Sequence, residues 1–318
     1  MARSPVAVGI VLGLLVGAGA AAAIAVTSSG TESSALPPKV SIAPRVAVSP
    51  TTATTTGGPL NEPQNLPELT GEARGYRLGT QPAPGAIDRL AVAFDMHAPV
   101  TTDAGGWVVR DGDKLLRVQR TAGLPWFFSL QNGSCQIVPE SPQPGATLQT
   151  VPPSGPTACP DTGAPPEATP GLALSHDDAL SFGMETLGRA GLGVSRPVIV
   201  DEPGGWYIEA SPLVGTTPTA GLPWTINVGP GATASAASGY LARPVRADTY
   251  RLVGVSQGLV RARQVADGGT ITGVRLGLML GHVGSAPYLV PAYLFELDGG
   301  GGPPPILPVP AVEDRYLS

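Results

Sequence analysis

The chain has 318 residues, a formal net charge of -5 and a pI near 5.2. Binding to nucleic acid requires a clustered basic face that neutralises phosphates, and no such cluster is present, so we exclude nucleic acid as a partner. Among the 19 basic residues only Lys39 and Lys114 are lysines, and small residues, Gly and Pro are abundant. This usage is typical of a GC-rich genome and agrees with an exported protein.

An uninterrupted apolar run occupies residues 5–26, shortly after Arg3. As a helix that rises about 1.5 Å per residue, the run would be about 33 Å long, enough to cross the hydrocarbon core of a bilayer. Residues 21–25 also offer A-x-A cleavage sites, so a cleaved secretory signal is the alternative. We therefore expect residues 1–30 to be a membrane anchor or signal, with the body of the chain outside the cytoplasm.

Residues 31–75 are rich in Ser, Thr and Pro and lack a sustained apolar period. Such a segment buries too little apolar surface to offset the entropy lost on ordering. We expect it to be a disordered stalk.

One sequence motif occurs twice in the body of the chain. Gly105-Gly106-Trp107 is followed by Thr-Ala-Gly-Leu-Pro-Trp at residues 121–126, and Gly204-Gly205-Trp206 is followed by the same six residues at 219–224. Two motifs in the same order at nearly the same offset indicate an internal duplication. The copies contain all four tryptophans, Trp107, Trp126, Trp206 and Trp224, which we interpret as core aromatics of the repeat. A surface role in ligand or partner binding is the alternative.

The first module is expected at residues 76–138. Ile87, Leu90, Ala91 and Phe94 fall at i, i+3, i+4 and i+7 and predict a short amphipathic helix. The turn residues 111–113 between two strand-like runs predict a hairpin.

A proline-rich insertion is expected at residues 139–171. Cys135 and Cys159, the only two cysteines, bracket most of it. In an oxidising compartment they are expected to form a disulfide that closes this loop; two free thiols are the alternative.

The second module is expected at residues 172–302. Ser175 with Asp178 is a capping pattern that predicts a helix ending near Gly191 or Gly193. A further helix is predicted near Ser256, followed by a hairpin of two strands up to residue 297. Because Pro291 cannot donate to a strand ladder, the second of these strands is predicted to be an edge or bulged strand. Residues 303–318 are predicted to be a tail.

The fold class predicted from these patterns is α+β. It consists of two related modules, each a helix packed on a small antiparallel sheet, after an N-terminal transmembrane helix.

The strongest catalytic pattern is the G-x-S-x-G match at residues 254–258, with Ser256 as its nucleophile. An acid and a histidine in later, well-separated loops are missing, so we interpret Ser256 as the cap of a helix. Asp177 and Asp178 fit the first turn of a helix better than a pair of catalytic acids. Two cysteines with His97, His176 and His282 do not form a zinc pattern. We expect no catalytic residue, no metal and no cofactor.

The second module resembles the PepSY-like pattern of a helix followed by antiparallel strands with a glycine turn. The resemblance lies in Ser175, Asp177, Asp178 and Ala179 and in the run from Trp224 to Ala232. Residues 76–297 are also similar to actinobacterial membrane-anchored proteins of unknown function that end in G-V-x-L-G and Y-L-V-P-A-Y strands, here at 273–277 and 288–293. PepSY-like domains are linked to extracytoplasmic inhibition or regulation, so the resemblance implies an interaction module.

We therefore expect a non-catalytic, extracytoplasmic, membrane-anchored interaction or regulatory protein of the cell envelope. Its expected partners are an envelope protein of unknown identity and the membrane itself, through residues 5–26. The alternative is a carrier of a small molecule or lipid with a cleft between the modules. A serine hydrolase that uses Ser256 is the least favoured hypothesis, and secretion after signal cleavage is the alternative localisation.

Overall fold

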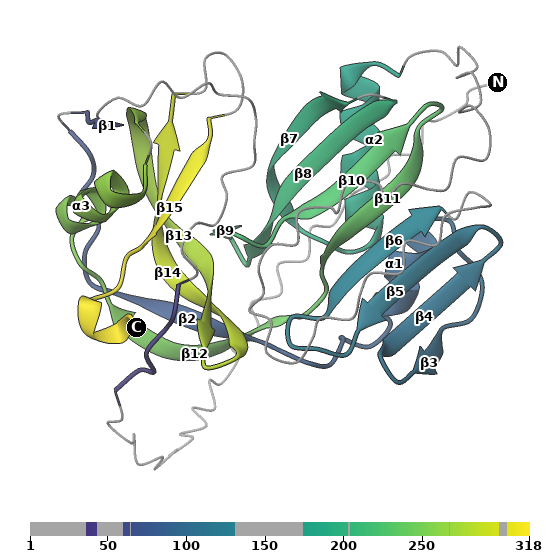
Figure 1. Ribbon diagram of the computed structural model, residues 1–318, viewed down its shortest axis with the longest axis horizontal. Helices are drawn as coiled ribbons and strands as arrows, with labels where there is room; N and C mark the ends of the chain where they lie inside the picture. The colour runs from purple at the N-terminus through teal and green to yellow at the C-terminus, as the bar shows by residue number, and fades with distance from the viewer. Residues whose placement is uncertain are drawn as a thin grey trace, which may run out of the picture. The chain divides into compact units, whose positions relative to one another are not determined.

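The computed structural model describes residues 36–42, 60–63, 65–130, 174–202, 204–266, 268–298 and 304–318 (Figure 1). Residues 37–318 group into one compact unit. Its helices are α1 (Ala86–Ala93), α2 (His176–Arg189), α3 (Val255–Val265) and the 3-10 turn η1 (Asp314–Tyr316). Its strands are β1 (Leu60–Asn61), β2 (Glu72–Leu78), β3 (Thr101–Asp103), β4 (Gly106–Asp111), β5 (Lys114–Gln119), β6 (Pro125–Leu130), β7 (Val194–Glu202), β8 (Gly205–Val214), β9 (Thr217–Ala220), β10 (Trp224–Gly229), β11 (Thr233–Tyr240), β12 (Pro244–Arg251), β13 (Gly269–Val283), β14 (Ala286–Leu297) and β15 (Ile306–Pro310).

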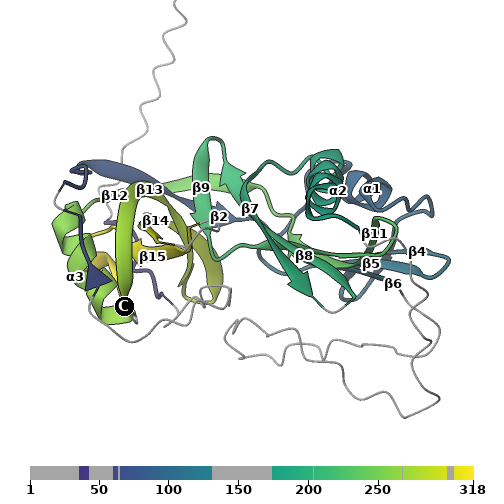
Figure 2. The ribbon, with the colours of Figure 1, turned by 90° about the horizontal axis from the view of Figure 1, so that it is seen from above.

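The duplicated segments build one continuous antiparallel run of strands in the order β7-β8-β10-β11-β6-β5-β4-β3. The first copy contributes β3 to β6 and the second contributes β7, β8, β10 and β11. The two sets meet where β6 pairs with β11, with Trp126 opposite Gly239. Figure 2 shows α1 and α2 on the same face of this run. The largest hydrophobic cluster of the described residues lies between these helices and the sheet.

The predicted pair of separate modules, each with its own small sheet, is therefore wrong. The described strands form one large mixed sheet of 15 strands. The physical reason is that β6 and β11 would each leave a row of unpaired backbone groups at the edge of a small sheet, and they pair with each other instead. The copies also differ from each other: β5 lies between β4 and β6, whereas β10 pairs directly with β8 and β9 pairs in parallel with β13.

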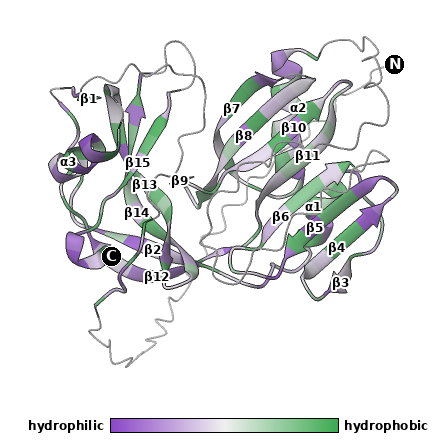
Figure 3. Cartoon of the chain, viewed as in Figure 1, coloured by the Kyte–Doolittle hydropathy of each residue, from purple (hydrophilic) through white to green (hydrophobic). Residues whose placement is uncertain are grey.

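Strand β14 is the centre of the remaining strands, where it pairs with β13, β2 and β15. Its side chains alternate between two hydrophobic clusters, as the period of two in a strand requires. Val290, Ala292 and Leu294 belong to one cluster, and Tyr293 and Phe295 belong to the cluster beneath α3. Figure 3 shows the hydrophobic character of β14 and the hydrophilic residues of α3.

Pro291 does not make β14 an edge strand or place it at a bulge, as the sequence had suggested. Next to Pro291 the neighbouring strand changes from β2, which pairs up to Leu289, to β15, which pairs from Ala292. The carbonyl of Pro291 accepts from Ala311 N at 2.9 Å. Neither β2 nor β15 pairs with Pro291, so the N–H that a proline lacks is not required by either strand. A proline is thus tolerated inside the sheet.

Both ends of the described chain are more ordered than the sequence predicted. In the predicted tail, β15 pairs with β14, and Leu307 and Val309 are buried. In the predicted stalk, Val40 is fully buried, and its backbone N donates to Tyr316 O at 2.7 Å. These segments are held by contacts with residues far away in the sequence, which local composition does not reveal.

The predictions of a transmembrane helix and of a disulfide also need correction. None of the helices in the described ranges is long and apolar enough to span a membrane, and residues 5–26 lie outside those ranges. Cys135 and Cys159 likewise lie outside the described residues, and those residues include no bridged cysteine pair.

Three predictions based on local patterns are confirmed. The stripe of Ile87, Leu90 and Ala91 forms the buried side of α1. Ser175 is the N-cap of α2, and its Oγ accepts from Asp178 N at 3.2 Å. Gly112, with a φ of 61°, makes the turn between β4 and β5.

Candidate binding pocket

A pocket of about 290 Å³ lies where the two copies meet the link to β12. Its walls come from four segments: the start of α1, the residues after α2, the end of β8 and the link between β11 and β12. Leu78, Thr219, Leu222, Trp224 and Tyr240 complete the lining. Its volume is close to the lower end of the usual range for small-molecule sites.

The wall behind α2 is shaped by the way that helix ends. Gly191 N donates to Gly188 O at 2.9 Å and Leu192 N donates to Leu187 O at 3.0 Å. Gly191 has a φ of 75°, which a glycine adopts without steric cost. This left-handed C-terminal turn carries residues 190–193 into the pocket wall.

Other parts of the wall are held by two side-chain hydrogen bonds to the backbone. Trp224 Nε1 donates to Tyr240 O at 3.0 Å, and Thr219 Oγ1 donates to Pro212 O at 2.8 Å. Both bonds join residues that line the pocket. The wall is thus fixed in the absence of any ligand, which reduces the entropy lost on binding.

Most of the pocket lining is apolar, and its charged residues are Arg89 and Arg243. No Asp or Glu is among the lining residues. The pocket therefore carries positive charge in a chain whose formal net charge is -5. Tyr240 adds a phenol whose pKa is raised by burial, so this hydroxyl is protonated and can donate a hydrogen bond at neutral pH.

Three of the four repeat tryptophans lie in one row across the sheet. Trp107 is opposite Val118, Val118 is opposite Trp126, and Trp126 is opposite Gly239, beside which Trp224 packs. Trp126 and Trp224 are buried, and Trp107 is partly buried against the same cluster. Trp206 packs there too, and its Nε1 donates to Leu174 O at 2.9 Å. Of the four, only Trp224 lines the pocket.

The glycines of the duplicated motif also have structural roles. A Cβ on Gly106 would overlap Val118 O, and a Cβ on Gly205 would overlap Val228 O. Gly123 and Gly221 have φ values of 90° and 80°, so the same turn precedes both tryptophan strands. The repeated motif thus specifies turns and close strand approach.

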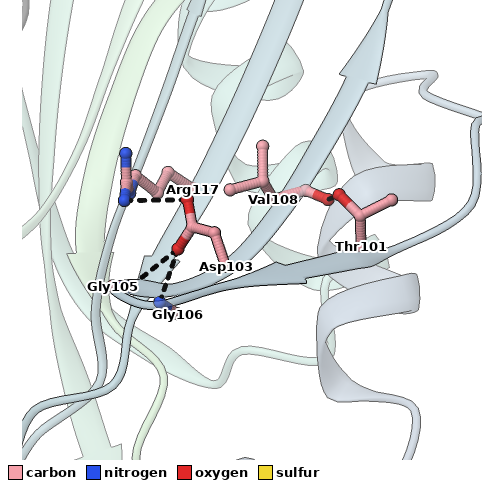
Figure 4. Close-up of polar contacts among 6 residues, drawn as sticks. All are labelled: Thr101, Asp103, Gly105, Gly106, Val108 and Arg117. Carbon is pink, nitrogen blue, oxygen red and sulfur yellow. Dashed lines mark hydrogen bonds and ion pairs between the residues drawn. The ribbon is translucent and has the colours of Figure 1, made fainter.

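Polar groups gather at the first Gly-Gly-Trp turn, which Figure 4 shows. Asp103 Oδ1 accepts from Gly105 N at 2.8 Å and from Gly106 N at 2.9 Å, and Asp103 Oδ2 pairs with Arg117 Nη2 at 3.0 Å. Thr101 Oγ1 donates to Val108 O at 2.9 Å. All these bonds tie β3 to its neighbours, so we interpret the cluster as a turn support.

The residues of the G-x-S-x-G match serve packing. Gly254 is the N-cap of α3, so Ser256 is an exposed residue of the first turn and not the cap that the sequence suggested. A Cβ on Gly258 would lie 2.5 Å from Tyr293 Cδ2, which explains the second glycine. Within the described ranges no hydrogen bond joins Ser256 to a histidine or a carboxylate. Burial lowers the pKa of His282, which lies on β13.

Asp177 and Asp178 lie in the first turn of α2, as the sequence predicted. Asp177 Oδ1 pairs with His176 Nδ1 at 2.9 Å on the exposed side of that helix. Among the described residues there is no group of three or more histidines, cysteines or carboxylates that could hold a metal ion.

Comparison with known proteins gives no further guidance to this site. No protein-family model matches the chain, and no curated protein matches it either. The PepSY-like resemblance therefore stays a prediction.

No residue was predicted to line this pocket, and Trp224 was predicted as a core aromatic of the repeat. Arg89, Gly191, Leu222 and Arg243 are far apart in the sequence, and none of them belongs to a recognisable ligand-binding motif. The sequence analysis predicted only, as an alternative, a cleft between two modules. That alternative indicates a region of the molecule but does not identify the residues that line it.

Proposed function

We propose that the chain is a non-catalytic binding protein that acts outside the cytoplasm and holds a small, mainly apolar molecule in the pocket between its two copies. The observation that carries the proposal is the pocket itself, an apolar hollow of about 290 Å³ with fixed walls and few polar groups. Such hollows at the junction of two structural units are common ligand sites.

The extracytoplasmic part of the proposal rests on sequence. The apolar run at residues 5–26 after Arg3 supports export, and the acidic composition supports a partner other than nucleic acid. The non-catalytic part is supported by the exposed, isolated position of Ser256 in α3. The envelope protein partner expected from the sequence stays a prediction.

Two-dimensional NMR of the labelled protein tests this proposal. Titration with octanoate and, separately, octanol should shift the amide signals of Gly191, Leu222 and Ala242, which line the pocket. Signals of Gly112, at the distant tip of the β4–β5 hairpin, should not move and serve as the internal control. Saturable shifts at none of the pocket residues with either compound would contradict the proposed function.

A further inference from the structure

The charges of the pocket restrict the class of ligand that it can hold. Two arginines and no carboxylate line it, so a cationic head would meet only like charge in a partly enclosed site. An anionic head would gain charge-assisted hydrogen bonds, which are stronger than those between neutral groups. The question is which of the two arginines is free to form them.

Arg89 already has a role within the protein. Its Nη1 donates to Pro84 O at 3.4 Å, and its Nε lies 3.5 Å from the position of a Cβ on Gly191, at the C-terminal end of α2. A guanidinium at the C-terminus of a helix interacts favourably with the negative end of the helix dipole. Arg89 thus contributes positive charge to the pocket, but its position is explained without a ligand.

Arg243 has no such partner. It is exposed on the link between β11 and β12, and it makes no ion pair or side-chain hydrogen bond with any residue in the described ranges. Asp248, on the strand that follows Arg243, is engaged by Tyr288 Oη at 3.0 Å and by Arg77 Nη2 at 3.8 Å. A guanidinium offers five N–H donors in a planar arrangement that fits a carboxylate or a phosphate.

Tyr240 lies three residues before Arg243 and also lines the pocket. Its ring packs with the cluster formed by Leu78, Leu222 and their neighbours, and its hydroxyl forms no hydrogen bond within the described part of the chain. A phenolic hydroxyl can donate a hydrogen bond to an acceptor on a ligand. Tyr240 and Arg243 therefore form a pair of unused donors beside an apolar hollow.

We propose that the pocket binds an amphiphile with an anionic head, which is held by Arg243 and the Tyr240 hydroxyl while the apolar chain fills the interior. This inference rests on the proposed binding function and adds the chemical class of the ligand. A water molecule occupies about 30 Å³ in the liquid, so the pocket has room for a ligand of about ten non-hydrogen atoms. Octanoate has that size.

Isothermal titration calorimetry with octanoate, octyl phosphate and octanol tests the inference. An anionic head should bind at least about tenfold more tightly than octanol, because a charge-assisted hydrogen bond contributes roughly a factor of ten or more. Arg243→Ala should remove most of that preference, and Tyr240→Phe should reduce it several-fold. Arg246→Ala is the matched control, since Arg246 is exposed on β12 and does not line the pocket.

The outcomes separate the inference from the proposed function. If octanol binds as tightly as octanoate and octyl phosphate, or if Arg243→Ala changes nothing, the anionic class is wrong while the binding pocket stands. If none of the three compounds binds, both the inference and the proposed function are wrong. Tighter binding of octyl phosphate than of octanoate that is lost in Arg243→Ala supports the inference and selects a phosphate head. Unchanged thermal unfolding of Arg243→Ala shows that the variant is folded.

Discussion

Gly239 lies at the junction of the two copies. It lies on β11 opposite Trp126, and a Cβ at this position would overlap Trp224 Cδ1. The buried Trp224 indole thus approaches a backbone position that has no side chain. A glycine in a strand commonly marks such a close approach.

Gly239→Ala is expected to lower the free energy of unfolding by about 1–3 kcal/mol, because the added methyl group overpacks the core. Gly188→Ala is the matched control. Gly188 is exposed in α2 with open space around its Cβ position, and alanine should raise stability there by about 0.5–1 kcal/mol. Urea denaturation of the three proteins measures both effects. Equal stability of Gly239→Ala and the unchanged protein would show that the Trp224 indole does not pack against Gly239.

At the scale of elements, local patterns were sufficient for some parts of the fold. Side chains spaced by one helical turn define α1, and a serine with a backbone partner three residues later begins α2. The turn at Gly112 likewise follows from residues next to one another. These features depend on contacts within a few residues, which a single sequence displays.

The sequence did not reveal contacts between distant elements. Nothing in the pattern of β6 indicates β11 as its neighbour, and β9 has too few residues to indicate its pairing with β13. The pocket depends on these same pairings, because its lining comes from separate segments between Leu78 and Pro244. The motif glycines and tryptophans could be recognised as important, but only the register shows that Trp107 and Trp126 share a row.

Arg261 links α3 to the C-terminal segment that the sequence had suggested to be a tail. Its Nη1 donates to Pro310 O at 2.6 Å and to Val312 O at 2.8 Å, and its Nη2 donates to Asp314 Oδ1 at 2.5 Å. The Arg261 side chain is almost fully buried, so its bonds to the two carbonyl groups are shielded from water, whereas the Asp314 side chain is exposed. One arginine thus fixes the end of β15 and the start of η1.

Arg261→Ala should reduce the free energy of unfolding by about 2–3 kcal/mol, since it leaves buried carbonyl groups without donors. Arg263→Ala, which removes a more exposed pairing with Glu62, should cost less than about 1 kcal/mol. Hydrogen exchange should also show faster exchange of the β15 amides in Arg261→Ala than in Arg263→Ala. Similar exchange rates and stabilities in the two variants would refute this role of Arg261.

At the scale of the whole molecule, the duplication has produced one folding unit in place of two. The antiparallel pairing of β6 with β11 joins the copies, and α1 and α2 share one hydrophobic cluster above them. The parallel pairing of β9 with β13 joins the second copy to the strands around β14. The pocket takes its walls from α1, from the second copy and from the link to β12, so it requires these parts to fold together.

Differential scanning calorimetry of the purified chain tests this claim most directly. Because the copies share a sheet and a core, we expect a single transition whose calorimetric and van't Hoff enthalpies agree. Two resolved transitions, one for the strands of each copy, would contradict the account and remove the structural basis of the pocket.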